Sequence, residues 1–157
     1  MRNTFPSILL LIACSFPINA QPSLDAAIDR DLPLLVQTYK TLHDNPELSH
    51  FEEKTAAFFA RELRALGYTV TERVGKYEDS RWTNYGVVAV LKNGAGPTVL
   101  LRTELDALPV TENTNLPYAS KVKTKNDAGQ DVSVMHACGH DVHMASMLGT
   151  AKMLAEL

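Results

Sequence analysis

Two short apolar runs in the middle of the chain constrain its fold most strongly. The run at 98–101 (TVLL) is apolar on both faces, which is typical of a central strand covered by helices. The run at 86–91 (GVVAVL) precedes it, and the turn residues at 93–96 (NGAG) lie between them. The pair is therefore predicted to form a β-hairpin. Alternating apolar and polar residues at 68–74 predict a further strand.

Segments with apolar residues at helical spacing surround these strands. They lie at 24–43, at 51–66 and at about 140–157. Ser49 followed by Glu52 is typical of a capping box at the start of the second helix. Residues 121–131 are charged and rich in turn formers, which predicts an exposed loop. Helices that flank a small sheet indicate an α/β layered fold.

The composition is that of a globular protein, and it argues against one class of function. The 157 residues are 45% hydrophobic and 21% charged, and the net charge is −3. Nucleic-acid binders normally carry a basic face or stripe, so no nucleic-acid partner is expected. The two cysteines, Cys14 and Cys138, are too few for a disulfide framework.

The first twenty residues have the pattern of a secretory signal peptide. Arg2 supplies a positive charge, residues 8–13 are apolar, and Ala20 ends a plausible cleavage site. Cleavage there predicts an exported protein, periplasmic or secreted, whose mature chain covers 21–157. The residues before Cys14 also resemble a lipobox, so a lipoprotein anchored through Cys14 is the alternative.

The densest group of metal-binding residue types lies at 135–143 (MHACGHDVH). Thiolate and imidazole are good ligands for zinc and similar metals, which makes Cys138 and His140 candidate ligands. Gly139 allows a tight turn between them. The site would lie at the start of the last helix, where the helix dipole favours a thiolate and the negative Asp141.

The remaining histidines of this segment are less clearly assigned. His136 and His143 are either further ligands or residues that pack around the site, and the whole segment could instead be a polar loop with a buried cysteine. The paired cysteines of a closed zinc knuckle are absent from the segment. It therefore resembles half of a metal site that distant residues complete.

Charged residues also follow the apolar run at 98–101. Arg102, Glu104 and Asp106 alternate with other residues, so they could share one face at the end of a strand. In open α/β sheets ligands bind at such ends. These residues are candidates for contacting substrate or orienting a ligand, although a simple ion pair would also explain them. The polar group at 43–49 is interpreted as a helix end and a turn rather than as a substrate contact.

Several motifs in order resemble one family. HDNPELSHFEEKT, GVVAVLKNGAGPTVLLRTELDALPV, LPYAS and above all MHACGHDVHMASMLGTAKML are similar to the amidohydrolase branch of the aminoacylase-type metallopeptidases. This branch contains hippurate hydrolases, N-acyl-L-amino-acid amidohydrolases and indole-acetyl-amino-acid hydrolases. The resemblance extends from about Asp31 onward.

The resemblance implies a fold and a chemistry. The chain would be the N-terminal part of a three-layer α/β catalytic domain with a mixed sheet, without the second half and the inserted dimerisation domain. A pair of divalent ions, zinc, manganese or nickel, would bind there, with Cys138 bridging them and His140 binding one. The general-base glutamate would lie beyond Leu157. The full-length protein would be a homodimer that hydrolyses N-acyl amino acids or related small amides, and the fragment alone would be inactive.

Two other interpretations compete with the enzyme. The chain could be a non-catalytic exported protein that binds metal through the residues from His136 to His143. It could also be a remnant that folds poorly, because half of an α/β domain leaves a sheet edge unpaired and an apolar face uncovered.

Overall fold

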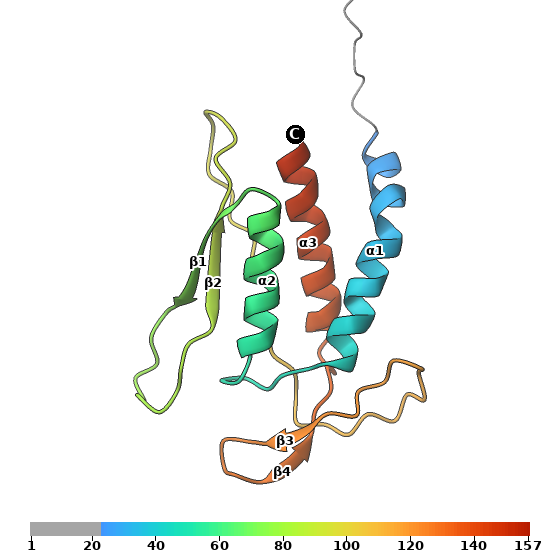
Figure 1. Ribbon diagram of the computed structural model, residues 1–157, viewed down its shortest axis with the longest axis vertical. Coiled ribbons are helices and arrows are strands. Elements are labelled where there is room, and N and C mark those ends of the chain that lie inside the picture. The colour runs from blue at the N-terminus through green and yellow to red at the C-terminus, as the bar shows by residue number, and fades with distance from the viewer. Residues whose placement is uncertain (1–22) are drawn as a thin grey trace, which may run out of the picture.

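The computed structural model describes residues 23–157, and three helices and two small sheets account for most of its ordered backbone (Figure 1). The predicted signal peptide and Cys14 lie outside the described residues. The elements are α1 (Leu24–Asp44), α2 (Glu53–Ala65), β1 (Thr69–Val74), β2 (Gly86–Val90), β3 (Lys123–Lys125), β4 (Asp131–Ser133) and α3 (His140–Glu156). The α/β class predicted from the sequence is confirmed, as are its three helices.

The helices form one layer, in which α3 lies between α1 and α2 (Figure 1). Their shared core contains Leu42, Phe59, Leu63, Met144, Leu148 and Ala151. Gly149 allows α1 to approach α3 closely, because a Cβ atom there would lie 2.7 Å from Leu35 Cδ1. Strands β1 and β2 pack against α2 and bring Val70, Val87 and Ala89 to the same core. Part of the periodic apolar set therefore faces a common interior, whereas Ile28, Leu32 and Val36 of α1 are 38%, 48% and 40% exposed.

The predicted hairpin between 86–91 and 98–101 is wrong. Strand β2 pairs in antiparallel register with β1 instead, from Thr69 opposite Val90 to Val74 opposite Gly86. Residues 98–101 form no strand, and Val99 and Leu100 are 77% and 88% exposed. A run that is apolar on both faces needs cover on both sides, and the described residues do not provide it.

The start of α2 also differs from the expected capping box. Glu52 is the N-cap residue and makes no side-chain capping hydrogen bond. The carboxylate of Glu47 takes this role: its Oε2 atom accepts hydrogen bonds from the backbone N–H and the hydroxyl of Thr55, at 2.7 and 2.8 Å. A carboxylate at a helix N-terminus is favoured by the helix dipole and by the unpaired N–H groups there.

The segment that was expected to be an exposed loop contains a small hairpin. Strands β3 and β4 pair in antiparallel fashion, and most of their residues are exposed. Leu48, Ala107 and Val134 form a second, smaller core. Backbone pairing of Leu48 with Ala107 and of Leu108 with Met135 joins the α1–α2 linker to the segments on either side of the predicted site. None of the helices at 23–157 is long and apolar enough to cross a bilayer.

Candidate metal centre

The predicted metal ligands lie in the turn that leads into α3. Gly139 adopts a left-handed conformation, with φ at 77°, which lets the chain turn sharply between Cys138 and His140. Cys138 is a free, exposed cysteine. His140 begins α3, and its side chain is 21% exposed. The turn thus leaves one thiol and one imidazole accessible from solvent, and their assignment as ligands stays a prediction.

The hydrogen bonding of His140 fits a metal ligand. Its Nδ1 atom lies 2.8 Å from the backbone oxygen of Asp106 and 3.1 Å from Asp106 Oδ1. Because a backbone carbonyl can only accept, Nδ1 carries the hydrogen and donates it. In the neutral ring the lone pair is then on Nε2, the atom that would bind a metal. A metal-binding histidine usually donates its other N–H to a carbonyl or carboxylate in this way.

The charged residues after 98–101 separate into two groups. Asp106 contacts His140, as described. Arg102 and Glu104 pair with each other at 3.2 Å, and the Arg102 side chain is 80% exposed. Glu104 also lies 4.0 Å from His143 Nδ1, and the His143 side chain is 61% exposed. The ion pair that the sequence allowed is therefore formed, and it lies on the exposed side of the site.

His136 is in a different environment from the other histidines of its segment. It is only 4% exposed, and neither of its ring nitrogens has a hydrogen-bond partner among the described residues. Burial lowers its pKa, so the ring is neutral at pH 7. Within 23–157 no three residues of ligand type come together as a complete metal cluster. A metal ion at Cys138 and His140 would therefore need further ligands besides the described residues.

Asp141 points away from the candidate ligands and into the protein. Its Oδ2 atom lies 2.6 Å from His43 Nδ1, and its Oδ1 atom accepts a hydrogen bond from the backbone N–H of Val142. The other ring nitrogen of His43 lies 3.0 Å from Glu112 Oε1. No sequence pattern points to Glu112, and the sequence predicts His43 only as part of a helix end. The one signal for a buried His43 is its position one helical turn after Tyr39, on the buried side of α1.

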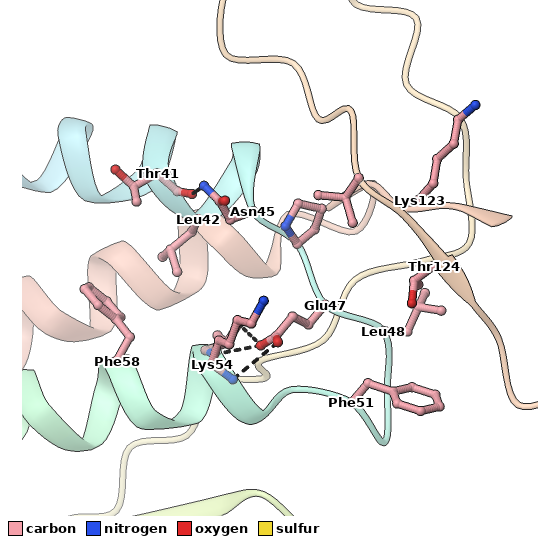
Figure 2. Close-up of a pocket in the computed structure, with 13 residues that line it drawn as sticks. Thr41, Leu42, Asn45, Glu47, Leu48, Phe51, Lys54, Phe58, Lys123 and Thr124 are labelled. Atoms are coloured by element: carbon pink, nitrogen blue, oxygen red, sulfur yellow. Dashed lines mark hydrogen bonds between the residues drawn. The ribbon is translucent and has the colours of Figure 1, made fainter. Parts of the chain in front are cut away.

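A cavity lies apart from the candidate metal centre. It has a volume of about 360 Å³ and lies between the end of α1, the α1–α2 linker, the start of α2 and β3 (Figure 2). Figure 2 shows Glu47 reaching from the linker to the first turn of α2. None of the predicted site residues lines this cavity, and it contains no cysteine or histidine. Its chemistry does not suit a metal centre.

An accessible thiol, an imidazole of fixed tautomer and an aspartate bonded to that imidazole form the candidate metal centre of this α/β chain, and known proteins are similar to it in sequence. Residues 100–157 match the model of peptidase family M20/M25/M40. The chain is 45% identical to hippurate hydrolase of Campylobacter jejuni, over 73% of this chain and 26% of that protein. It is 42% identical to thermostable carboxypeptidase 1 of Saccharolobus solfataricus, over 78% and 27%.

Solved structures agree with the sequence relatives. The YXEP protein of Bacillus subtilis, described as a dinuclear metal binding peptidase from the M20 family, superimposes with a TM-score of 0.63 at 34% identity. The match covers 85% of this chain and 32% of that one. The chain belongs to peptidase family M20/M25/M40, and it spans less than a third of the length of these relatives.

Proposed function

We propose that the whole protein is a metal-dependent amidohydrolase that cleaves N-acyl amino acids or related small amides. The observation that carries this proposal is the His140 side chain, whose Nδ1–H is fixed by Asp106 while Nε2 is left for a metal, two residues from the exposed thiol of Cys138. The names of the relatives support amide or peptide hydrolysis. The general base and the remaining ligands come, in this proposal, from residues outside this chain.

The residues of this chain would hold and orient rather than carry out the proton transfers. Cys138, as a thiolate, and His140, through Nε2, would bind a pair of divalent ions such as zinc, manganese or nickel. The chemistry that such ions supply is Lewis acidity toward the scissile carbonyl and the attacking water. Asp106 would keep the imidazole in the correct tautomer. Arg102 and Glu104, on the exposed side, would contact substrate.

The local metal-binding alternative has less support. It requires several residues between His136 and His143 to converge on one ion, and the described residues hold no such group of three. His136 is buried, whereas His143 is largely exposed. Two ligands and an orienting aspartate suit a shared, catalytic centre better.

The test uses the whole protein with and without the thiol. Cys138→Ala should abolish both metal loading, measured by elemental analysis, and hydrolysis of a panel that includes N-benzoylglycine and N-acetyl amino acids. Ser146→Ala, which changes an exposed position of the same helix, is the matched control and should keep both. Full metal content and full turnover in Cys138→Ala would rule out the proposal.

We also propose that the protein is exported and that the enzyme is a homodimer. Export follows from the signal-peptide pattern at 1–20, with lipidation of Cys14 as the alternative. The intact mass of the protein from its native source distinguishes cleavage after Ala20 from a lipidated Cys14, and an uncleaved N-terminus contradicts both. Size-exclusion chromatography with light scattering tests the dimer.

A further inference from the structure

The end of α1 carries a buried histidine with a carboxylate on each side. The side chains of His43, Asp141 and Glu112 are only 6%, 2% and 0% exposed. Both ring nitrogens face carboxylate oxygens, at 2.6 and 3.0 Å. A carboxylate accepts hydrogen bonds and does not donate them, so both ring nitrogens must donate and His43 is an imidazolium. We call these three residues the His43 cluster.

Electrostatics support this protonation state. Burial by itself lowers the pKa of His43, but the hydrogen bonds to Glu112 and Asp141 outweigh it and hold that pKa above its usual value. Burial raises the pKa of Glu112, and hydrogen bonds from Thr114, His43 and Ser120 more than offset it. One cation is thus enclosed between two anions in a region closed to solvent.

Each carboxylate of the cluster fixes a different segment. Glu112 accepts hydrogen bonds from the Thr114 hydroxyl and, at 2.6 Å, from the backbone N–H of Ser120, which anchors the loop at 112–120. Asp141 belongs to the first turn of α3. The rings of Tyr39 and Tyr118 pack on His43, with centroids 5.6 and 5.5 Å away. His43 therefore joins α1, this loop and the start of α3.

The start of α3 depends on such anchoring. Its N-cap residue is Gly139, which makes no side-chain capping hydrogen bond. Only two side chains of the first turn are tied to other segments through described hydrogen bonds, namely His140 to Asp106 and Asp141 to His43. The two side chains point in different directions, His140 toward the candidate metal centre and Asp141 into the core. If Asp141 moves, the first turn and the His140 ring move with it.

We propose that His43 is a positioning residue for the metal centre, because it holds Asp141 and thereby fixes the helix turn that presents His140. This inference rests on the proposed function, since it assumes that His140 and Cys138 bind metal. It assigns to His43 a role that acts through another residue, without contact with metal or substrate. Direct hydrogen-bond partners of metal ligands change metal affinity by about 10–100-fold when they are removed. His43 acts one residue further away, through Asp141, so an effect at the lower end of that range is expected.

The test measures Co²⁺ binding to the metal-free whole protein, through the thiolate-to-cobalt absorption band and by competition with a chelator. His43→Gln should lower Co²⁺ affinity about 10-fold or more and weaken or shift the band. The matched control is Asp31→Asn. Asp31 is also a buried charged residue between α1 and α3, bonded to Lys152 at the other end of the helices. Asp31→Asn should destabilise the fold but leave the Co²⁺ affinity and the absorption band unchanged.

The Co²⁺ affinities of the two variants distinguish a positioning role of His43 from a purely structural one. Equal losses of affinity in His43→Gln and Asp31→Asn would mean that His43 acts only on stability, and wild-type affinity in His43→Gln would also overturn the proposal. If His43→Gln does not fold, Glu112→Gln carries the test: it should give a smaller loss of Co²⁺ affinity, and no loss would refute the role. A wild-type protein without the thiolate band, or with the same band in Cys138→Ala, would overturn the proposed function itself and this inference with it.

Discussion

The two ends of the α1–α3 pair are joined by opposite arrangements of charge. At the end away from the candidate metal centre, one buried carboxylate, Asp31, is bonded to two cations near the surface, Arg30 and Lys152. At the other end, one buried cation, His43, is bonded to two buried carboxylates. The cations at the first end can turn toward water if their partner is lost. The carboxylates at the second end cannot.

This difference predicts at which end a substitution lowers the free energy of unfolding more. His43→Gln leaves Asp141 and Glu112 without a cation in a region closed to solvent, which should lower the free energy of unfolding by about 3 kcal/mol. Asp31→Asn should lower it less, because the Arg30 and Lys152 side chains are already 46% and 30% exposed. Urea denaturation of both variants, followed by circular dichroism, gives the comparison. A larger loss in Asp31→Asn would reverse the ranking of the two ends.

The sequence predicts the helices well and the strand pairing poorly, for a physical reason. Apolar periodicity indicates where α1, α2 and α3 lie in the sequence, but in a strand it does not identify the pairing partner. The short turn at 93–96 favoured a hairpin with 98–101, yet β2 pairs with β1 across the longer loop at 75–85. Closing a longer loop costs little extra entropy. A good turn signal is therefore weak evidence against a more distant partner.

The candidate site likewise contains residues that the sequence predicts and residues that it does not. Cys138, Gly139 and His140 are adjacent in the sequence, so their pattern is visible without a structure. The bond between His43 and Glu112 joins residues 69 positions apart, and that between His43 and Asp141 spans 98. Neither has a local signature, because only the packing of α1 against α3 and against the loop at 112–120 brings the partners together.

The two ends should also respond differently to pH. The folded-state pKa of His43 is raised, so its contribution to stability is complete below pH 6.5, its usual pKa, and is lost as the pH rises through the higher folded value. The pKa of Asp31 is lowered, so its contribution is complete above pH 3.8 and is lost only as the pH falls below that. The groups that face His43 are Glu112, Asp141, Tyr39 and Tyr118. Between pH 6 and 9, the contribution of His43 to the free energy of unfolding should decrease and that of Asp31 should stay constant.

The loss on deprotonation should be smaller than in His43→Gln, because a neutral imidazole still fills its space and keeps one hydrogen bond. The measurement is the free energy of unfolding from pH 6 to 9, with a chelator present, for the wild type and for His43→Gln. His136 has a lowered pKa and contributes in the opposite direction. Besides burial, the charge on His43 is one cause of that lowering, so the difference between the two curves reports His43 together with its effect on His136. A difference that does not shrink as the pH rises would contradict the assigned charge of His43.

The smallest effect on stability is expected for the exposed ion pair between Arg30 and Glu156, at the Asp31 end of the helices. Glu156 bonds to Arg30 at 2.7 Å, but their side chains are 42% and 46% exposed. Exposed pairs of this kind contribute little and are screened by salt, and Arg30 keeps its bonds to Asp31 when Glu156 is changed. Glu156→Gln should therefore leave the melting temperature nearly unchanged, and any small loss should vanish in 1 M NaCl. If Glu156→Gln is as damaging as Asp31→Asn at both salt concentrations, the four charges of that end act as one cooperative unit. The sensitivity of the two ends would then depend on how their charges are connected and not on which charge is buried.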